Sequence, residues 1–368
     1  MKPHNYRKYV EFAGLCLLAG ALFWWFGRNL NWTEVRQAVG HSDPYLLAAA
    51  TTIVCLTYVM RAFRWGALLR PLGPSRFSDL FSATTVGFGA VFLIGRAGEV
   101  IRPVVLPMRD PRVRPSASFV TIMVERIYDM MAVVLLFSLN LIWFKTPVSL
   151  QNDFTKVRVA GIGLLVATII GIGVLIWFRK NSKWVIDVLT RLLDGWHFIP
   201  KRLSKLVIST LEQLARALRV LVNFAELAET IGWTAVLWLS VAVANLLVAR
   251  AFGLNFVLSQ SVFVLGWSLA GSLVPTPGGA AGAFHAATAA GFIFLGVAPE
   301  TAAAISIVMH IIDFGPAVLF GFFYMIRGDL NFSKLRALAA PEAVEHVVED
   351  EELVPQNLSG ESRTLGAS

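Results

Sequence analysis

Charged residues, glycines and a proline interrupt the apolar run at residues 77–106 in its middle: Gly95-Arg96-Ala97-Gly98-Glu99-Val100-Ile101-Arg102-Pro103. A second apolar run, at residues 256–295, is broken in a similar way by Pro275-Thr276-Pro277-Gly278-Gly279. Lipid cannot satisfy the N–H and C=O groups of irregular backbone, so such breaks must be buried in protein or line a wet cavity. The two breaks therefore predict two re-entrant hairpins of half-helices whose tips meet around a cavity.

The rest of the chain favours the same membrane setting. Hydrophobic residues make up 56% and charged residues 15% of the 368 residues, and the mean hydropathy is +0.64. A soluble domain has about 45–50% apolar and about 25% charged residues, so this composition excludes a disordered chain, a coiled coil and a disulfide scaffold. Long apolar runs predict an all-α polytopic membrane protein with about six full transmembrane helices besides the two hairpins. These runs occupy residues 10–27, 45–63, 116–144, 159–178, 231–251 and 301–326.

Arginines on both sides of the first broken run predict its threading. Arg61, Arg64, Arg70 and Arg76 precede it, and Arg109, Arg112 and Arg114 follow it. The positive-inside rule places both groups in the cytoplasm, so the hairpin enters and leaves on one side and both chain termini are cytoplasmic. A competing prediction treats every apolar run as a full span, which gives eight crossings. It places Arg109, Arg112 and Arg114 outside the cell, which the positive-inside rule disfavours. The formal net charge of +8 points to anionic lipid headgroups, and no nucleic-acid partner is expected.

The predicted order of elements has an internal symmetry. A span, a hairpin and a span occupy about residues 45–144, and the same unit returns upside down at about residues 231–326. Inverted repeats with broken helices at the midplane are a transporter architecture. Amphipathic helices at about 180–229 are expected on the cytoplasmic surface, either as a docking or gating element or as a linker on the headgroups. Residues 1–336 form the transmembrane domain in this interpretation, and 337–368 an acidic, disordered tail.

Ionisable residues at membrane depth are the candidate site, because each costs about 2.5–3.5 kcal/mol on insertion. In the first half, Arg96, Glu99 and Arg102 are spaced so that Glu99 can pair with either arginine. The second half repeats the spacing of Arg126 and Asp129 as His310 and Asp313, and glycines after a proline offer N–H groups as an anion cradle. The predicted substrate-binding set is Arg96, Glu99, Arg102, Glu125, Arg126, Asp129, Pro275, Gly278, Gly279, His285, His310 and Asp313. The alternative is a structural ion network that fixes the hairpins.

Sequence motifs for catalysis and for metal or cofactor binding are missing. The chain has no H-E-x-x-H, no G-x-S-x-G and no Gly-rich Lys loop, so we expect neither an enzyme nor a cofactor. The two cysteines, Cys16 and Cys55, lie in apolar runs and are interpreted as packing residues rather than metal ligands.

Four motifs in this order resemble the family of the lysylphosphatidylglycerol synthase transmembrane region, also called the flippase-like domain family. They are Arg61-Ala62-Phe63-Arg64-Trp65 with Leu68-Leu69, Gly95-Arg96-Ala97-Gly98-Glu99-Val100-Ile101-Arg102, Glu125-Arg126-Ile127-Tyr128-Asp129 and Pro275-Thr276-Pro277-Gly278-Gly279. The resemblance implies a prokaryotic inner-membrane protein whose relatives move a modified anionic or aminoacylated phospholipid, or are associated with polyprenyl-linked sugars or hopanoids. The soluble aminoacyl transferase domain is not expected here. Where the family places a Glu after the turn, this chain has one extra residue and His285.

The hypothesis from the sequence is a lipid translocase. Arg96, Arg102 and Arg126 would bind the headgroup phosphate, since Arg offers bidentate geometry. The carboxylates would balance the charge of the empty site or receive a headgroup amine, and His285 and His310 would couple transport to protons. Three alternatives stay open: a small-solute or ion transporter, an intramembrane enzyme such as a lipid phosphatase, and a non-transporting partner of a lipid-synthesis enzyme.

Overall fold

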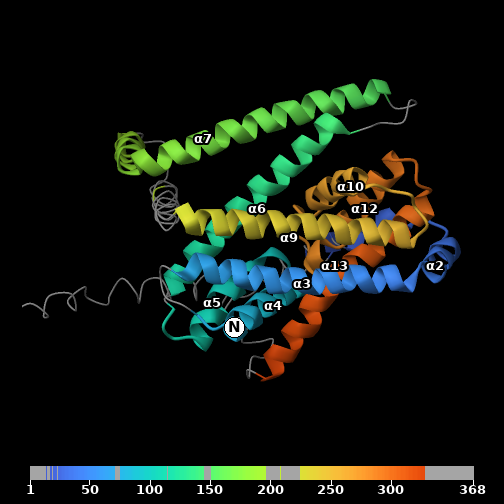
Figure 1. The fold of residues 1–368 in the computed structure, drawn as a ribbon, viewed down its shortest axis with the longest axis horizontal. Coiled ribbons are helices and arrows are strands. Elements are labelled where there is room, and N and C mark those ends of the chain that lie inside the picture. The colour runs from blue at the N-terminus through green and yellow to red at the C-terminus, as the bar shows by residue number, and fades with distance from the viewer. Residues whose placement is uncertain are drawn as a thin grey trace, which may run out of the picture.

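A computed structural model of the protein describes residues 24–70, 75–113, 115–144, 151–195 and 224–327, together with residues 14, 17–18, 20–22 and 208. Every regular element in these ranges is a helix (Figure 1). The elements are α2 (Trp32–Gly40), α3 (Pro44–Leu69), α4 (Phe77–Ile94), η2 (Gly95–Val100), α5 (Ile101–Arg109), α6 (Pro115–Trp143), α7 (Gln151–Gly195), α9 (Phe224–Ala251), α10 (Leu258–Gly271), α11 (Pro277–Ala280), α12 (Ala283–Phe294) and α13 (Pro299–Arg327).

Several of these helices have the length and apolar character of membrane spans. Among the described residues, four qualify: Pro44–Leu69, Phe77–Ile94, Leu227–Ala251 and Pro299–Arg327. The predicted class, an all-helical polytopic membrane protein, is therefore confirmed. The number of full crossings and the re-entrant path of α4 and α5 stay predictions.

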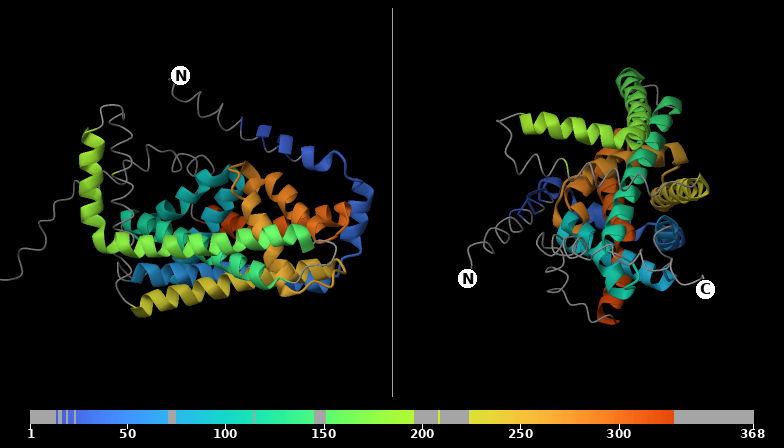
Figure 2. Two further views of the ribbon diagram at one scale, coloured as in Figure 1. Left: turned by 90° about the horizontal axis from the view of Figure 1, so that it is seen from above. Right: turned by 90° about the vertical axis from the view of Figure 1, so that its left-hand side faces the viewer.

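The helices α3 and α9 pack side by side as an antiparallel pair along one face of the molecule (Figures 1 and 2). At one end the Asp43 N–H donates to the Ala251 carbonyl at 2.8 Å. At the other end Arg70 and Glu229 form an ion pair at 2.9 Å. The side chain of Asp43 also caps α3, accepting from two backbone N–H groups of its first turn, as N-cap residues do. The start of α3 therefore lies at the end of α9, and the two helices run in opposite directions.

The first break reverses the chain at Gly95. This residue has a φ of +69°, which favours glycine. The turn η2 follows, and α5 then packs back against α4. Gly98 makes this return possible, because a Cβ atom there would lie 2.4 Å from the backbone of Ala90 and Val91.

The second break separates α10 from α12, which pack side by side. Between them Gly278 and Gly279 have positive φ values of 77° and 63°. The two breaks meet in space, since a Cβ atom on Gly95 would lie 3.3 Å from the Thr276 carbonyl oxygen. The two breaks are therefore in contact, whereas the re-entrant hairpins and the cavity between them stay predictions.

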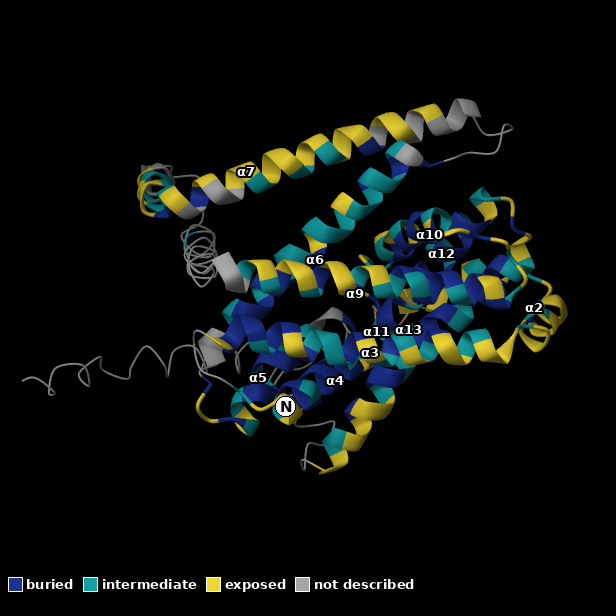
Figure 3. Cartoon of the chain, in the orientation of Figure 1, coloured by how far each residue is buried: buried dark blue, intermediate teal, exposed yellow. Residues whose placement is uncertain are grey.

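Packing in the first half has a counterpart in the second. α5 contacts α6 as α12 contacts α13, and α3 contacts α4 as α9 contacts α10. Across the halves, α4 packs on α13 and α10 packs on α6. Burial follows this arrangement, with α4 among the most buried helices and α7 exposed along most of its length (Figure 3).

α7 lies at the edge of the molecule and packs against α6. Its backbone departs from helical geometry at Asn181, and Figure 2 shows the part after this residue turned across the direction of the rest. The rings of Trp177 and Trp184 meet edge to face across the bend at 6.1 Å. The first part of the predicted amphipathic connection is thus helical. Residues 196–207 and 209–223, and the predicted acidic tail, lie outside the described residues.

Close approach of α4 and α13 depends on small residues. A Cβ atom on Gly321 would lie 2.7 Å from the Thr85 carbonyl oxygen, and one on Gly89 would lie 3.2 Å from the Ala317 carbonyl oxygen. Small residues allow membrane helices to pack backbone to backbone in this way.

We expect Gly321→Ala to lower the free energy of unfolding by about 1–3 kcal/mol, because the new methyl group forces α13 away from α4. The thermal unfolding midpoint of the detergent-purified protein measures this change. The matched control is Gly232→Ala on α9, where a Cβ atom meets nothing within 4 Å. Equal midpoints for Gly321→Ala and the wild type would contradict the close contact.

Candidate functional site

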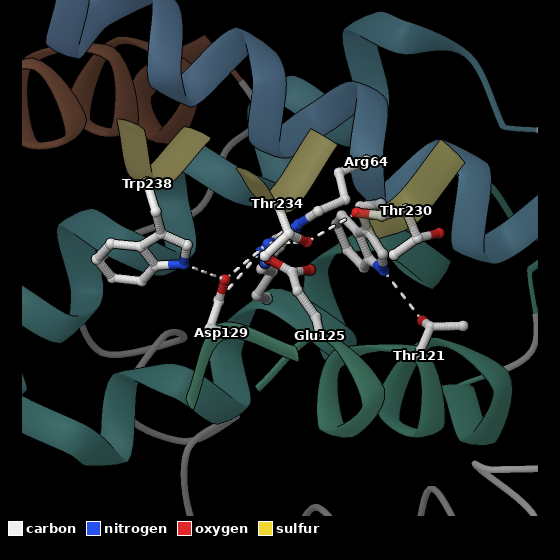
Figure 4. A network of polar contacts seen from close by, with 9 residues as sticks. Arg64, Thr121, Glu125, Asp129, Thr230, Thr234 and Trp238 are labelled. Atoms are coloured by element: carbon white, nitrogen blue, oxygen red, sulfur yellow. Dashed lines mark hydrogen bonds and ion pairs between the residues drawn. The ribbon is translucent and has the colours of Figure 1, made fainter. Parts of the chain in front are cut away.

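Arg64 lies at the centre of a buried network of charged and polar side chains (Figure 4). Its side chain is 0% exposed. Nη1 donates to Asp129 Oδ1 at 2.6 Å and to Thr234 Oγ1 at 3.1 Å. Nη2 donates to Glu125 Oε1 at 2.7 Å and to Asp129 Oδ2 at 3.0 Å. One guanidinium on α3 thereby joins α6 and α9.

Arg102 on α5 completes the network. Its Nη1 donates to Glu125 Oε1 at 2.9 Å, so this oxygen accepts from two arginines. Its guanidinium also lies over the ring of Trp65, 4.1 Å from the centroid. Trp238 Nε1 donates to Asp129 Oδ1 at 3.0 Å. We call Arg64, Arg102, Glu125 and Asp129 the Arg64 cluster.

The position of Arg64 corrects the sequence analysis. Positive-inside reasoning put Arg61 and Arg64 in a cytoplasmic connection, but both lie within α3, and Arg64 is completely buried. The physical reason is that Glu125 and Asp129 lie one turn apart on α6 and need a cation from another helix. The signal that could have indicated Arg64 is its place in the first family motif.

The sequence predicted that Glu99 could pair with Arg102. This prediction is wrong, because Arg102 forms its ion pair with Glu125. The backbone leaves the α-helix for a 3-10 turn at Gly95–Val100 and re-enters it at Ile101. Glu99 and Arg102 therefore stand on different segments. Within the described part of the chain, Glu99 has no ion pair. The side chain of Arg96 lies outside the described residues.

Two further arginines lie against one aromatic ring. The Cζ atoms of Arg61 and Arg126 are 4.8 Å and 5.7 Å from the ring centroid of Phe88 on α4. Neither arginine side chain forms a hydrogen bond or ion pair with any described residue. Tyr58 packs edge-on against the same ring at 5.6 Å and donates through its hydroxyl to the Asp313 carbonyl at 2.7 Å. We call Arg61, Phe88 and Arg126 the Phe88 platform.

The two predicted histidines form a separate cluster at the second break. Their rings meet edge to face at 4.6 Å, and His310 also stacks on Phe284 at 4.8 Å. His310 Nε2 lies 3.1 Å from the Gly279 carbonyl oxygen, and His285 Nδ1 accepts from the Gly282 N–H at 3.2 Å. A Cβ atom on Gly279 would lie 2.9 Å from His310 Nε2, so a larger residue there would displace the imidazole or the turn.

The predicted polar centre is therefore divided. Arg102, Glu125, Arg126 and Asp129 come together as expected, whereas His285 and His310 hold the tip of the second hairpin. No hydrogen bond or ion pair between described residues joins the histidines to the Arg64 cluster. The carbonyl of Gly279 meets His310, and Pro275 is exposed. The anion cradle of glycine N–H groups stays a prediction.

Arg64→Ala is expected to lower the free energy of unfolding by about 3–5 kcal/mol, since it leaves buried carboxylates without their cation. Arg61→Ala, one turn earlier on the same helix, breaks no hydrogen bond and is expected to unfold at the wild-type temperature. Thermal unfolding followed by tryptophan fluorescence compares the two. A loss of stability in Arg61→Ala as large as that in Arg64→Ala would refute this assignment.

His310→Phe keeps the aromatic packing and removes the hydrogen bond to Gly279. The loss of one hydrogen bond is expected to raise hydrogen exchange of the backbone at residues 276–283 about two- to tenfold. Mass spectrometry of deuterated peptides measures this, with peptides of α9 as the internal control. Unchanged exchange at the tip would mean that His310 does not hold it.

Comparisons of the sequence with known proteins identify its family. A family model described as "Lysylphosphatidylglycerol synthase TM region" matches residues 12–321. The chain is also 29% identical over 143 residues to "Glycosyltransferase AglD" of Haloferax volcanii, an alignment that covers 36% of this chain and 21% of that protein. The chain therefore matches about a fifth of the length of that relative. Since the family model covers most of the sequence, the chain belongs to the family of the lysylphosphatidylglycerol synthase transmembrane region.

Proposed function

We propose that the protein is a lipid translocase that moves an anionic or modified phospholipid, or a polyprenyl- or hopanoid-type lipid, across the cytoplasmic membrane. The observation that carries the proposal is the concentration of four arginines, Arg61, Arg64, Arg102 and Arg126, among helices of a membrane protein. Charges at this depth are rare unless they mark a substrate or ion pathway.

The packing supports the transporter architecture on which the proposal depends. The first helices of the two halves, α3 and α9, are antiparallel, and each neighbouring pair in one half has its counterpart in the other. We interpret these halves as inverted repeats with two re-entrant hairpins, and both chain termini as cytoplasmic. The contact between Gly95 and Thr276 joins the hairpins at their tips.

Arginines with unused donors give the headgroup a place to bind. Nε and Nη2 of Arg102 and Nε of Arg126 are buried and have no partner among the described residues. Guanidinium groups bind phosphate through paired N–H donors, and the acyl chains would stay in the surrounding lipid. The chemistry is transport, without a catalytic residue, so the glycosyl transfer in the name of AglD is not proposed for this chain.

Reconstitution into liposomes tests the proposal. Headgroup-labelled anionic, zwitterionic and polyprenyl lipids are incorporated, and a membrane-impermeant reagent measures their movement between leaflets. We expect wild-type protein to accelerate one lipid class at least about tenfold over protein-free vesicles, and Arg126→Ala to lose most of this acceleration. Arg36→Ala, an exposed residue of α2, is the control and keeps wild-type transport.

Two outcomes contradict this proposal. If no lipid class moves faster than in protein-free vesicles, the protein is not a translocase for these lipids. A small-solute transporter or a non-transporting partner of a lipid-synthesis enzyme then explains the fold better. If Arg126→Ala transports as well as wild type, the arginines are structural.

A further inference from the structure

The exposed surface of α7 changes character along the helix. Its part Gly161–Val174 is apolar and mostly exposed. After Asn181 the exposed side chains include those of Lys183, Asp187 and Arg191. An apolar surface favours the hydrocarbon core of a membrane, whereas a charged surface favours water. The boundary of the hydrocarbon core is therefore expected close to the bend at Asn181.

The length of the predicted span at residues 159–178 agrees with this boundary. At about 1.5 Å per residue, this run covers about 30 Å, which is the thickness of the hydrocarbon core. The exposed side chains of Arg158 and Lys180 flank the run at its two ends. Long basic side chains at such positions reach the headgroups while their stems stay in apolar surroundings. Arg158 and Lys180 are therefore expected at the two membrane surfaces.

The bend is built into the sequence of α7. Asn181 has a φ of −114° and a ψ of 18°, which are not helical values. Its side-chain amide donates to the Trp177 carbonyl at 3.0 Å, and Asn side chains compete in this way with helical hydrogen bonds. Figures 1 and 2 show the bend at the end of the molecule where α3 ends and α9 begins. A helix that turns at this level can lie along the membrane surface.

Two tryptophans and two lysines surround the bend. The rings of Trp177 and Trp184 contact each other edge to face at 6.1 Å, although these residues are 49% and 59% exposed. Lys180 and Lys183 are also exposed, and neither forms an ion pair or a hydrogen bond with a described residue. We call Trp177, Lys180, Lys183 and Trp184 the α7 elbow. Exposed indole rings beside exposed ammonium groups are typical of the interface between hydrocarbon and water.

The charge of this part of the chain indicates which lipids it attracts. Among the described side chains after the bend, those of Lys183 and Arg191 are basic and that of Asp187 is acidic. Lys180 adds a further positive charge at the bend, and Arg70 lies at the same end of the molecule, after α3. The predicted topology makes this end cytoplasmic. The cytoplasmic leaflet carries anionic lipids, which attract basic segments.

We infer that the α7 elbow binds the headgroups of anionic phospholipids in the cytoplasmic leaflet. The rings of Trp177 and Trp184 lie at the level of the headgroups, and the ammonium groups of Lys180 and Lys183 bind the phosphates. The part of α7 after Asn181 then lies along the membrane surface and anchors the protein there. This assigns the start of the connection to the headgroups rather than to the docking of a protein. The inference does not depend on lipid transport.

Photocrosslinking of the full chain in liposomes tests the inference. The probes are phosphatidylglycerol and phosphatidylcholine, each with a photoreactive group on its headgroup, and mass spectrometry of chymotryptic peptides locates the label. We expect phosphatidylglycerol to label residues 177–191 at least about fivefold more than phosphatidylcholine does, because basic residues near the surface attract anionic lipid. High salt is expected to reduce this preference, since it screens exposed charges.

Matched variants separate the two lysines from the net charge of the protein. The double variant Lys180→Gln, Lys183→Gln is expected to lower the preference for phosphatidylglycerol to about one. The control Arg36→Gln, Arg76→Gln removes the same charge from exposed residues of other helices and is expected to keep the preference. Trp184→Phe tests the depth of the elbow. The emission lost in this variant is expected to be quenched more by lipids brominated near the headgroup than by lipids brominated near the terminal methyl group.

Distinct results would overturn the inference. Equal labelling by the two lipids in the wild-type protein would remove the preference for anionic headgroups. An unchanged preference in Lys180→Gln, Lys183→Gln would show that these lysines do not bind the lipid. Crosslinks from residues 177–191 to a second copy of the chain, in place of lipid, would make the elbow a contact between protomers. Competition by soluble glycerophosphoglycerol would indicate a site for a free anion. None of these results depends on movement of lipid between leaflets.

Discussion

The bridge from Arg64 to Glu125 and Asp129 is the interaction on which the rest of the structure depends. Removing three charges from water is expensive, and their attraction compensates only if the geometry is good and most hydrogen bonds are made. The geometry requires α3, α6 and α9 to lie at fixed positions, and Arg102 adds α5 through the shared Glu125 oxygen. The first hairpin is thereby fixed by charge to α3, α6 and α9, while close packing of small residues fixes it to α13.

Two arginines one turn apart on α3 consequently have different surroundings. The guanidinium of Arg64 donates to two carboxylates, whereas that of Arg61 lies against the phenyl ring of Phe88. The two side chains are chemically identical. Their surroundings differ because different residues of the neighbouring helices pack against α3 at the two positions. The ion-paired cluster of Arg64 therefore lies one helical turn from an arginine that packs on an aromatic ring.

Hydrogen bonds at the second break satisfy backbone groups that are outside regular helix. Glycines with positive φ leave the helix and expose backbone carbonyls, which lipid cannot satisfy. His310 supplies a partner for the Gly279 carbonyl from α13, and His285 accepts the Gly282 N–H within the hairpin. Aromatic rings surround both imidazoles, so the two residues serve the tip of the hairpin rather than the arginine centre.

The sequence by itself determined the membrane class, the helices and the positions of both breaks, because apolar run length, glycine and proline act locally. It also placed Glu125, Arg126 and Asp129 in the site, since charges within an apolar run are costly wherever the helix lies. The tertiary structure decided the rest. Arg64 at the centre, the pairing of Arg102 with Glu125 rather than Glu99, and the separation of the histidines from the arginines all depend on which helices cross and at what level. The partner of a buried charge is a residue far away in the chain. Helical periodicity carries no information about which distant residue that partner is.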